Sequence, residues 1–178
     1  MAQLPVGLFC LVSLVGPVLG MLHSSMTIEE IVDFVQSLGE VLTLNPGPGD
    51  GSPEVAWGDW FFYYTPGDVV PGGQPFATIV TKDYPDDERS RLDRPGAFRV
   101  NVAAGKPAFV EWTGHQPGEP ADDVDPSVPD TVFAHPVYGS LGWLSVVNPG
   151  PATTQATRNT LRKAYELARS RYERRMSV

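Results

Sequence analysis

Hydrophobic positions recur at helical spacing near both ends of the chain. Residues 28–38 form the first helical pattern, and their apolar members share one stripe: Ile28, Ile31, Val32, Val35 and Leu38. Thr27 and Glu30 have the spacing of a capping box, with Met26 and Ile31 in the staple positions around it. The pattern predicts a helix that begins at this capping box and does not depend on the residues before it.

The second helical pattern closes the chain, beginning at Thr153 or Thr154, either of which can cap it. Its apolar stripe has the same period, with two members at its margins: Leu161, Tyr165, Ala168 and Tyr172, then Ala164 and Leu167. The spacing predicts a long helix that packs against a core through one face.

Runs of β-branched and aromatic residues between the two helices predict four or five strands: Trp57–Tyr64, Phe76–Thr81, Ala97–Val102 and Gly142–Val147, with Val41–Leu44 as a short run that could pair with a sheet edge. The run Val132–Tyr138 leads into the last of these strands. In Ala97–Val102, alternation places Arg99 and Asn101 on the face opposite Val100. The stretch 106–112 fits a helix or a strand. The fold class predicted is α+β, an antiparallel sheet with N- and C-terminal helices packed on one face.

The chain has 178 residues, enough for a single domain, which we place at 26–176 with an acidic, proline-rich surface loop at 114–130. Residues 1–25 form an apolar leader without the basic start of a signal peptide, since no Lys or Arg precedes Lys82. We therefore favour translation starting at Met26 and a cytoplasmic protein. The alternative is a secreted protein with residues 1–20 as a cleaved signal peptide. The single cysteine, Cys10, lies in the leader.

Charge is unevenly distributed along the chain. The net charge is −8, but residues 152–178 carry seven Lys or Arg and two acids, so they contribute +5 and the remainder −13. Arg158, Arg162 and Arg169 would share a helix face, whereas Arg171 lies well around the helix. We expect at most weak, salt-labile nucleic-acid binding, because an acidic body repels phosphates and cations near a helix C-terminus are common for other reasons.

A charged loop joins two of the predicted strands and is the main candidate site. Six of its residues and neighbours could converge where strands end: Lys82, Asp83, Asp93, Arg94, Arg99 and Asn101. Arg94 or Arg99 could clamp a carboxylate or phosphate, which suits a small anionic molecule. The alternative is that these charges hold the loop through salt bridges and turn hydrogen bonds.

His135 is the histidine in the most distinctive motif, HPVYG. It could bind the same ligand, or act as a general base with Asp83 or Asp93 in a small hydrolase or isomerase. Alternatively, it fixes the turn before Pro136 by bonding to the backbone. The sequence shows no nucleophile motif, metal-ligand set or cofactor loop, so we predict no metal and no cofactor, and favour a non-enzymatic domain.

Several motifs in order resemble domain-of-unknown-function family 6194, a family of high-GC bacteria. They are FATIVTKDYP, LDRPGAFRVN, HPVYG, a tryptophan five residues beyond Tyr138, an NP pair, and the final AYELAxxRYxRR helix. The resemblance covers about residues 27–175 and implies no known activity. A weaker likeness to the MmcQ/YjbR-like group implies a CyaY-like sandwich and, by analogy alone, weak DNA binding. The leader and the acidic loop depart from the family pattern.

Overall fold

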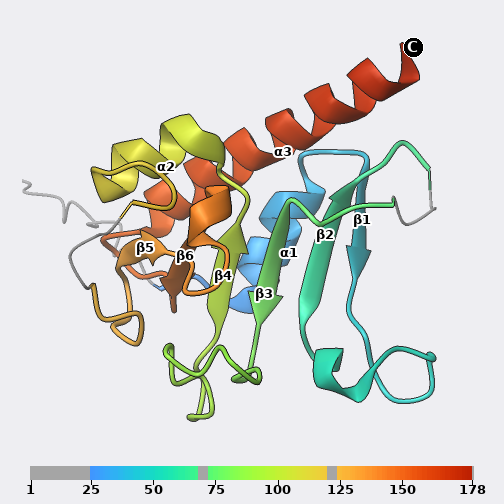
Figure 1. Ribbon diagram of the computed structural model, residues 1–178. Helices are drawn as coiled ribbons and strands as arrows, with labels where there is room; N and C mark the ends of the chain where they lie inside the picture. Colours follow the sequence, from blue (N-terminus) through green and yellow to red (C-terminus); the bar gives the residue numbers. More distant parts are fainter. Residues whose placement is uncertain (1–24, 68–71, 120–123, 178) are drawn as a thin grey trace, which may run out of the picture.

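The structure is a computed structural model that describes residues 25–67, 72–119 and 124–177. The predictions made for the leader therefore lie outside the described residues, apart from residue 25. Between residues 25 and 177, the described chain folds around one sheet (Figure 1).

Six strands form this sheet in the order β1-β2-β3-β4-β6-β5, and each neighbouring pair is antiparallel. Their bounds are β1 (Val41–Leu44), β2 (Trp60–Tyr64), β3 (Ala77–Val80), β4 (Arg99–Val102), β5 (Val132–Ala134) and β6 (Leu144–Val147). β1 and β5 occupy the two edges (Figure 1). The predicted strands are thus confirmed, with shorter bounds except for Val41–Leu44, and β5 is a further strand at the start of the run 132–138.

The main helices are α1 (Ile28–Gln36), α2 (Gly105–Thr113) and α3 (Thr154–Met176), with short 3-10 turns η1 (Glu54–Ala56) and η2 (Gly139–Leu141). α1 and α3 pack on one face of the sheet, where Ile31 and Leu161 join Ile79 in the main core. α2 packs at the β5 end, with Phe109 against Leu144. The α+β class with terminal helices on one face is confirmed, and the ambiguous stretch 106–112 is helical. No helix among the described residues has the length and apolar character that crossing a bilayer requires.

The two long terminal helices begin differently. α1 has the predicted capping box, in which the Glu30 N–H donates to the Thr27 hydroxyl and the Thr27 N–H donates to the Glu30 carboxylate. At α3, Thr153 is the cap residue, but its hydroxyl donates to Asp130. The Asp130 carboxylate also accepts from the N–H groups of Gly150 and Thr153. The predicted threonine side-chain cap is therefore absent, and Asp130 from the segment before β5 instead holds the turn that leads into α3, which local spacing could not reveal.

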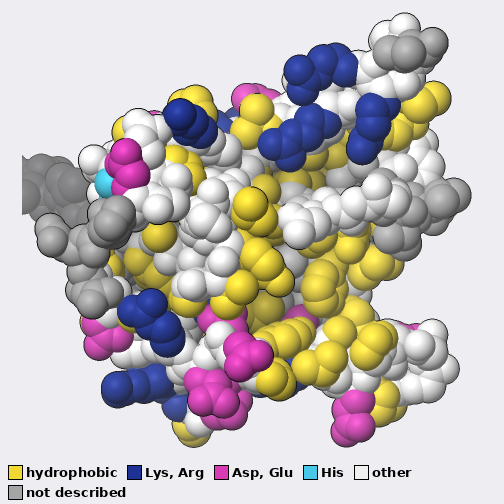
Figure 2. Space-filling model, in the orientation of Figure 1, with side chains coloured by type: hydrophobic (Ala, Val, Ile, Leu, Met, Phe, Trp, Pro, Cys, Tyr) yellow, Lys and Arg dark blue, Asp and Glu magenta, His cyan; other side chains and the backbone are white. Residues whose placement is uncertain are grey.

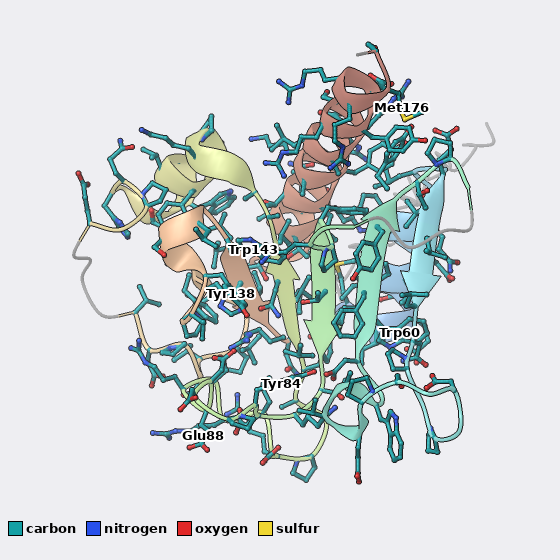
Figure 3. The ribbon with its side chains drawn as sticks, turned by 45° about the vertical axis from the view of Figure 1, so that its right-hand side comes forward. Trp60, Tyr84, Glu88, Tyr138, Trp143 and Met176 are labelled. Carbon is teal, nitrogen blue, oxygen red and sulfur yellow. The ribbon has the colours of Figure 1, made fainter. Side chains whose placement is uncertain are left out.

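The face of the sheet opposite α1 and α3 is covered at one end by the loop between β3 and β4. Leu92 from this loop packs with Val80, Phe133 and Val147. These three strand residues alternate with the residues that face α1 and α3, so they lie on the opposite face of the sheet. Figure 3 shows the loop residues Tyr84 and Glu88 near this end of the strands. The loop thereby encloses the polar side chains of β4.

Candidate functional site

A row of polar side chains crosses the middle of the sheet on the loop-covered face. The register pairs Thr78 with Asn101 and Asn101 with Ser145. Asn101 Nδ2 donates to Thr78 Oγ1 at 3.0 Å, and Ser145 Oγ donates to Asn101 Oδ1 at 2.8 Å. Because all three are buried, these hydrogen bonds satisfy groups that would otherwise be costly to bury.

Arg99 extends this row into the loop, although its side chain is only 2% exposed. Its Nε donates to Asn101 Oδ1 at 2.8 Å, and Nη1 donates to Ser90 Oγ at 2.8 Å. Both terminal nitrogens bind the Asp87 carboxylate, a bidentate charged pair. Nη2 also lies 3.3 Å from His135 Nε2. Four of the five N–H groups of Arg99 therefore donate to Asn101, Ser90 and Asp87, and the side chain is committed to these internal partners.

His135 fixes the turn that follows β5. Its Nδ1 accepts from the N–H groups of Val137 and Tyr138, at 3.1 and 3.2 Å. Burial, followed by the nearby Arg99 charge, lowers the pKa of His135 to about 3. The ring is therefore neutral near pH 7, and the two donors at Nδ1 place its proton on Nε2. This arrangement fits the turn-fixing alternative and occupies the nitrogen that a general base would use.

Asp83 and Asp93 bind backbone groups of their own loop. Asp83 Oδ1 accepts from the Leu92 N–H at 2.8 Å, and Asp93 Oδ1 accepts from the Asp83 N–H at 3.0 Å. Within the described residues, no hydrogen bond connects either carboxylate to His135. The predicted acid–base pair is therefore not assembled in this structure.

The two remaining predicted cations also bind inside the protein. Lys82 Nζ donates to the Trp57 carbonyl at 2.6 Å and lies 3.3 Å from Asp59 Oδ2. Asp59 is fully buried and also accepts from the hydroxyl of Tyr84. Arg94 Nη2 donates to the Ser127 carbonyl at 2.7 Å. These contacts close the loop onto the segment before β2 and onto the segment before β5.

The structure thus brings Arg99, Asn101 and His135 together and gives the other predicted residues separate internal partners. Asp59, Asp87 and Ser90 complete these networks and were missed in the sequence. The signal for Asp59 was a lone acid directly before the aromatic run WFFYY. Asp87 carried no signal, because Asp86 and Glu88 beside it have the same charge.

A groove of about 320 Å³ lies elsewhere, between α3 and the sheet. We call it the α3 groove and define it by six of its lining residues: Tyr63, Gln74, Leu141, Trp143, Arg171 and Arg175. Figure 2 shows Lys and Arg side chains gathered over the C-terminal half of α3, away from the acidic loops at the opposite end of this face. Helical spacing separates Arg171 from the other arginines of this helix, but it gave no reason to assign Arg171 to a site.

The other cations of α3 have partners. Arg158 and Arg162 stand over the Phe34 ring, with their guanidinium carbons 5.4 and 5.5 Å from its centroid. The remaining pairs are Lys163 with Glu111, Arg169 with Glu173, and Arg174 with the Ser170 carbonyl. By contrast, neither Arg171 nor Arg175 forms a hydrogen bond or ion pair with another described residue.

A second and larger groove, of about 840 Å³, runs along the β5 edge of the sheet. We call it the β5 groove and define it by Trp112, Glu119, Val124, residues 132–134 and Val137. His135 also lines it, although only 5% of this residue is exposed. Across the described part of the chain, no group of three or more His, Cys, Asp or Glu residues is arranged to hold a metal ion.

Comparison with known proteins identifies a family. Neither the curated proteins nor the solved structures include a match to this chain. The distant likeness to the MmcQ/YjbR-like group, with its CyaY-like fold, therefore stays a prediction. The family described as "Family of unknown function (DUF6194)" matches residues 26–177, which is most of the chain. The chain therefore belongs to the DUF6194 family.

Proposed function

We propose that this domain is a non-enzymatic binding protein that takes a small anionic molecule into the α3 groove. Arg171 and Arg175 carry the proposal, because they line the groove and have no partner among the described residues. They are four residues apart on α3 and so lie on the same side of the helix. Two guanidinium groups beside one groove can bind a carboxylate or a phosphate through several charged hydrogen bonds.

The rest of the lining indicates the other half of the ligand. Tyr63, Tyr64 and Trp143 bring aromatic rings to the groove. The Tyr64 hydroxyl donates to Glu40 at 2.6 Å, and this hydrogen bond raises the pKa of Tyr64 to about 12. Its hydroxyl is therefore engaged, and its ring remains as a wall. We infer a ligand with a flat or apolar part next to its anionic group, of a size suited to the small end of ligand pockets.

The predicted ligand class, a small anionic molecule, is unchanged, but its proposed site is the α3 groove and not the loop between β3 and β4. Arg94 and Arg99 were the predicted clamps, but both donate to internal acceptors. A binding role without chemistry also agrees with the environment of His135, whose Nδ1 accepts two backbone hydrogen bonds. The hydrolase or isomerase alternative would need Asp83 or Asp93 beside that ring, and no observation favours it.

Weak nucleic-acid binding is the second alternative from the sequence. It would need a basic surface that neutralises several phosphates. Most cations of α3 instead stack on Phe34 or bind neighbouring acceptors, which leaves Arg171 and Arg175 over one small groove. Such a pair suits a single anionic group better than a duplex backbone. A cytoplasmic location agrees with a metabolite ligand and is proposed on that basis.

A thermal-shift titration tests the proposal. Inorganic phosphate, citrate and phenyl phosphate would serve as probes at two salt concentrations, with wild type, Arg171→Ala and Arg175→Ala compared. We expect the unfolding temperature to rise most with phenyl phosphate, and this rise to disappear in both variants. Arg174→Ala is the matched control, because it removes the same charge from the neighbouring position outside the groove.

Equal shifts in Arg174→Ala and Arg171→Ala would show that the probes respond to overall charge, and would contradict a site in the α3 groove. A shift abolished by Arg94→Ala, in a variant that still folds, would return the ligand to the loop. Absence of a shift with all three probes would also count against the proposal.

A further inference from the structure

β5 is an edge strand whose outer side opens into the β5 groove. It pairs with β6 on one side and with no other described strand. Val132, Phe133 and Ala134 all line the groove, although side chains of consecutive strand residues point to opposite faces. A groove that touches all three therefore follows the backbone edge and not one face of the sheet.

The hydrogen-bond pattern identifies the backbone groups on that edge. The His135 N–H donates to the Trp143 carbonyl at 3.0 Å. In an antiparallel pair the bonded positions alternate, so Phe133 bonds to its partner Ser145, and the intervening residues point away from β6. The N–H and C=O groups of Val132 and Ala134 thus face the groove, and no other described residue bonds to them. An edge of this kind is a template for another strand.

Apolar side chains stand on both sides of this edge. Trp112 at the end of α2 is 43% exposed, Val124 is 47% exposed, and Val137 in the turn after β5 is 46% exposed. Large apolar side chains gathered around a groove mark a surface that binds a partner. These side chains line the same groove as the strand edge, so an extended chain paired there would contact them.

The charges at this edge favour a basic partner. Glu119 lines the groove and belongs to the segment 114–130, which contains no Lys or Arg, and the whole chain has a net charge of −8. Hydrogen bonds from Ser127 lower the pKa of Asp125, which keeps that carboxylate ionised. Arg89 also lines the groove, and its positive charge acts on Asp125, which leaves Glu119 as the acid of the lining. A second copy of this chain would bring like charges together, whereas a Lys- or Arg-bearing segment would be attracted.

We propose that the β5 edge binds an extended segment of another protein, which pairs with the backbone of Val132 and Ala134 as a seventh strand. Its alternate apolar side chains would contact Trp112 and Val137, and its basic residues would lie near Glu119. The affinity comes from main-chain hydrogen bonds, and the flanking side chains select the sequence. This site is separate from the α3 groove and does not depend on a ligand there.

Fluorescence anisotropy tests the proposal with a labelled short peptide in which valine alternates with lysine and threonine. We expect Ala134→Pro, which removes one outward N–H, to weaken binding at least about tenfold. Thr43→Pro is the matched control on the opposite edge. The Thr65 N–H donates to the Glu40 carbonyl, so Glu40 is a bonded position of the β1–β2 pair. Bonded positions alternate along an antiparallel pair, and Thr43 lies three residues further on, so its N–H points away from β2. Thr43→Pro should bind the peptide like wild type.

Two further measurements test binding at the β5 edge if Ala134→Pro fails to fold. Trp112→Ala, at an exposed position, should also weaken binding, and amide exchange at Val132 and Ala134 should slow when peptide is added. A peptide with glutamate in place of lysine should bind several-fold more weakly. Equal binding of both peptides would overturn the charge argument.

Other results would overturn the proposal itself. These are undiminished binding by folded Ala134→Pro, no binding by wild type, or concentration-dependent self-association that the peptide does not compete with. Peptide binding that is strong only after residues 1–24 are deleted would assign the edge to the protein's own N-terminal segment instead.

Discussion

Arg99 and the pair Arg171 and Arg175 show two opposite uses of the same side chain. Arg99 is buried on the sheet, and its donors meet Asp87, Ser90 and Asn101. Arg171 and Arg175 are exposed beside the α3 groove and meet no described partner. The comparison teaches that an arginine near the end of a strand is a binding candidate only if its guanidinium donors are not already satisfied.

Arg158 and Arg162 occupy a position between these extremes. Their guanidinium groups lie over the Phe34 ring, which links α3 to α1 without a carboxylate partner. They add a modest attraction to packing and leave their donors partly exposed. The arginines of this protein therefore include some that hold a loop, some that stack between helices, and some that remain for a ligand.

The largest expected difference concerns stability. Arg99→Leu removes the partner of the mostly buried Asp87 carboxylate, and we expect it to lower the free energy of unfolding by about 3–5 kcal/mol. Arg171→Leu should change it by no more than about 0.5 kcal/mol. Urea denaturation of both variants measures this. If Arg99→Leu lowers the free energy of unfolding by less than about 1 kcal/mol, Arg99 does not have the structural role described here.

The second prediction concerns pH and the His135 contact with Arg99. The native pKa of His135 is about 3, whereas the unfolded ring titrates near about 6.5, so the unfolded state binds more protons between these values. The stabilisation is present above pH about 6.5 and is lost as the pH falls. It amounts to about 2 kcal/mol between about pH 7 and about pH 5.

His135→Asn should flatten this part of the pH profile, because an amide oxygen can accept the Val137 and Tyr138 N–H groups and does not titrate. Urea denaturation at several pH values compares the two proteins. An identical slope in the variant would show that His135 is not the group responsible.

The third prediction separates charge from geometry at the α3 groove. Arg171→Lys keeps the positive charge but loses the planar fork, and we expect phenyl phosphate to bind about tenfold more weakly, or about 1.4 kcal/mol. Isothermal titration calorimetry gives the affinity. The variant should unfold like wild type. Unchanged affinity would indicate that the groove attracts anions only by its overall charge.

The smallest expected effect concerns the stacked arginines. Arg162→Ala removes one of the two guanidinium groups over Phe34, and should lower the free energy of unfolding by about 0.5–1 kcal/mol. Arg174→Ala, which removes an exposed charge from the same helix, provides the reference in urea denaturation. A loss comparable to that expected for Arg99→Leu would place Arg162 among the structural arginines instead.

Much of the fold could be predicted because its signals are local. The capping box of Thr27 and Glu30 and the stripe of Leu161 and Tyr165 depend on residues within a few turns of one another. Alternation along β4 likewise places the side chains of Arg99 and Val100 on opposite faces of the sheet. These features follow from backbone periodicity, which the sequence carries directly.

The partners of the charged residues were decided by tertiary structure. Arg99 pairs with Asp87, twelve residues away, in a loop with other acids of equal charge, and the path of the loop selects one of them. Asp130 holds the turn before α3 only because the segment before β5 lies beside Gly150. Hydrogen bonds and ion pairs act over a few ångströms. The sequence therefore determined which groups could bind, while the folded backbone decided which of them meet and which remain available to a ligand.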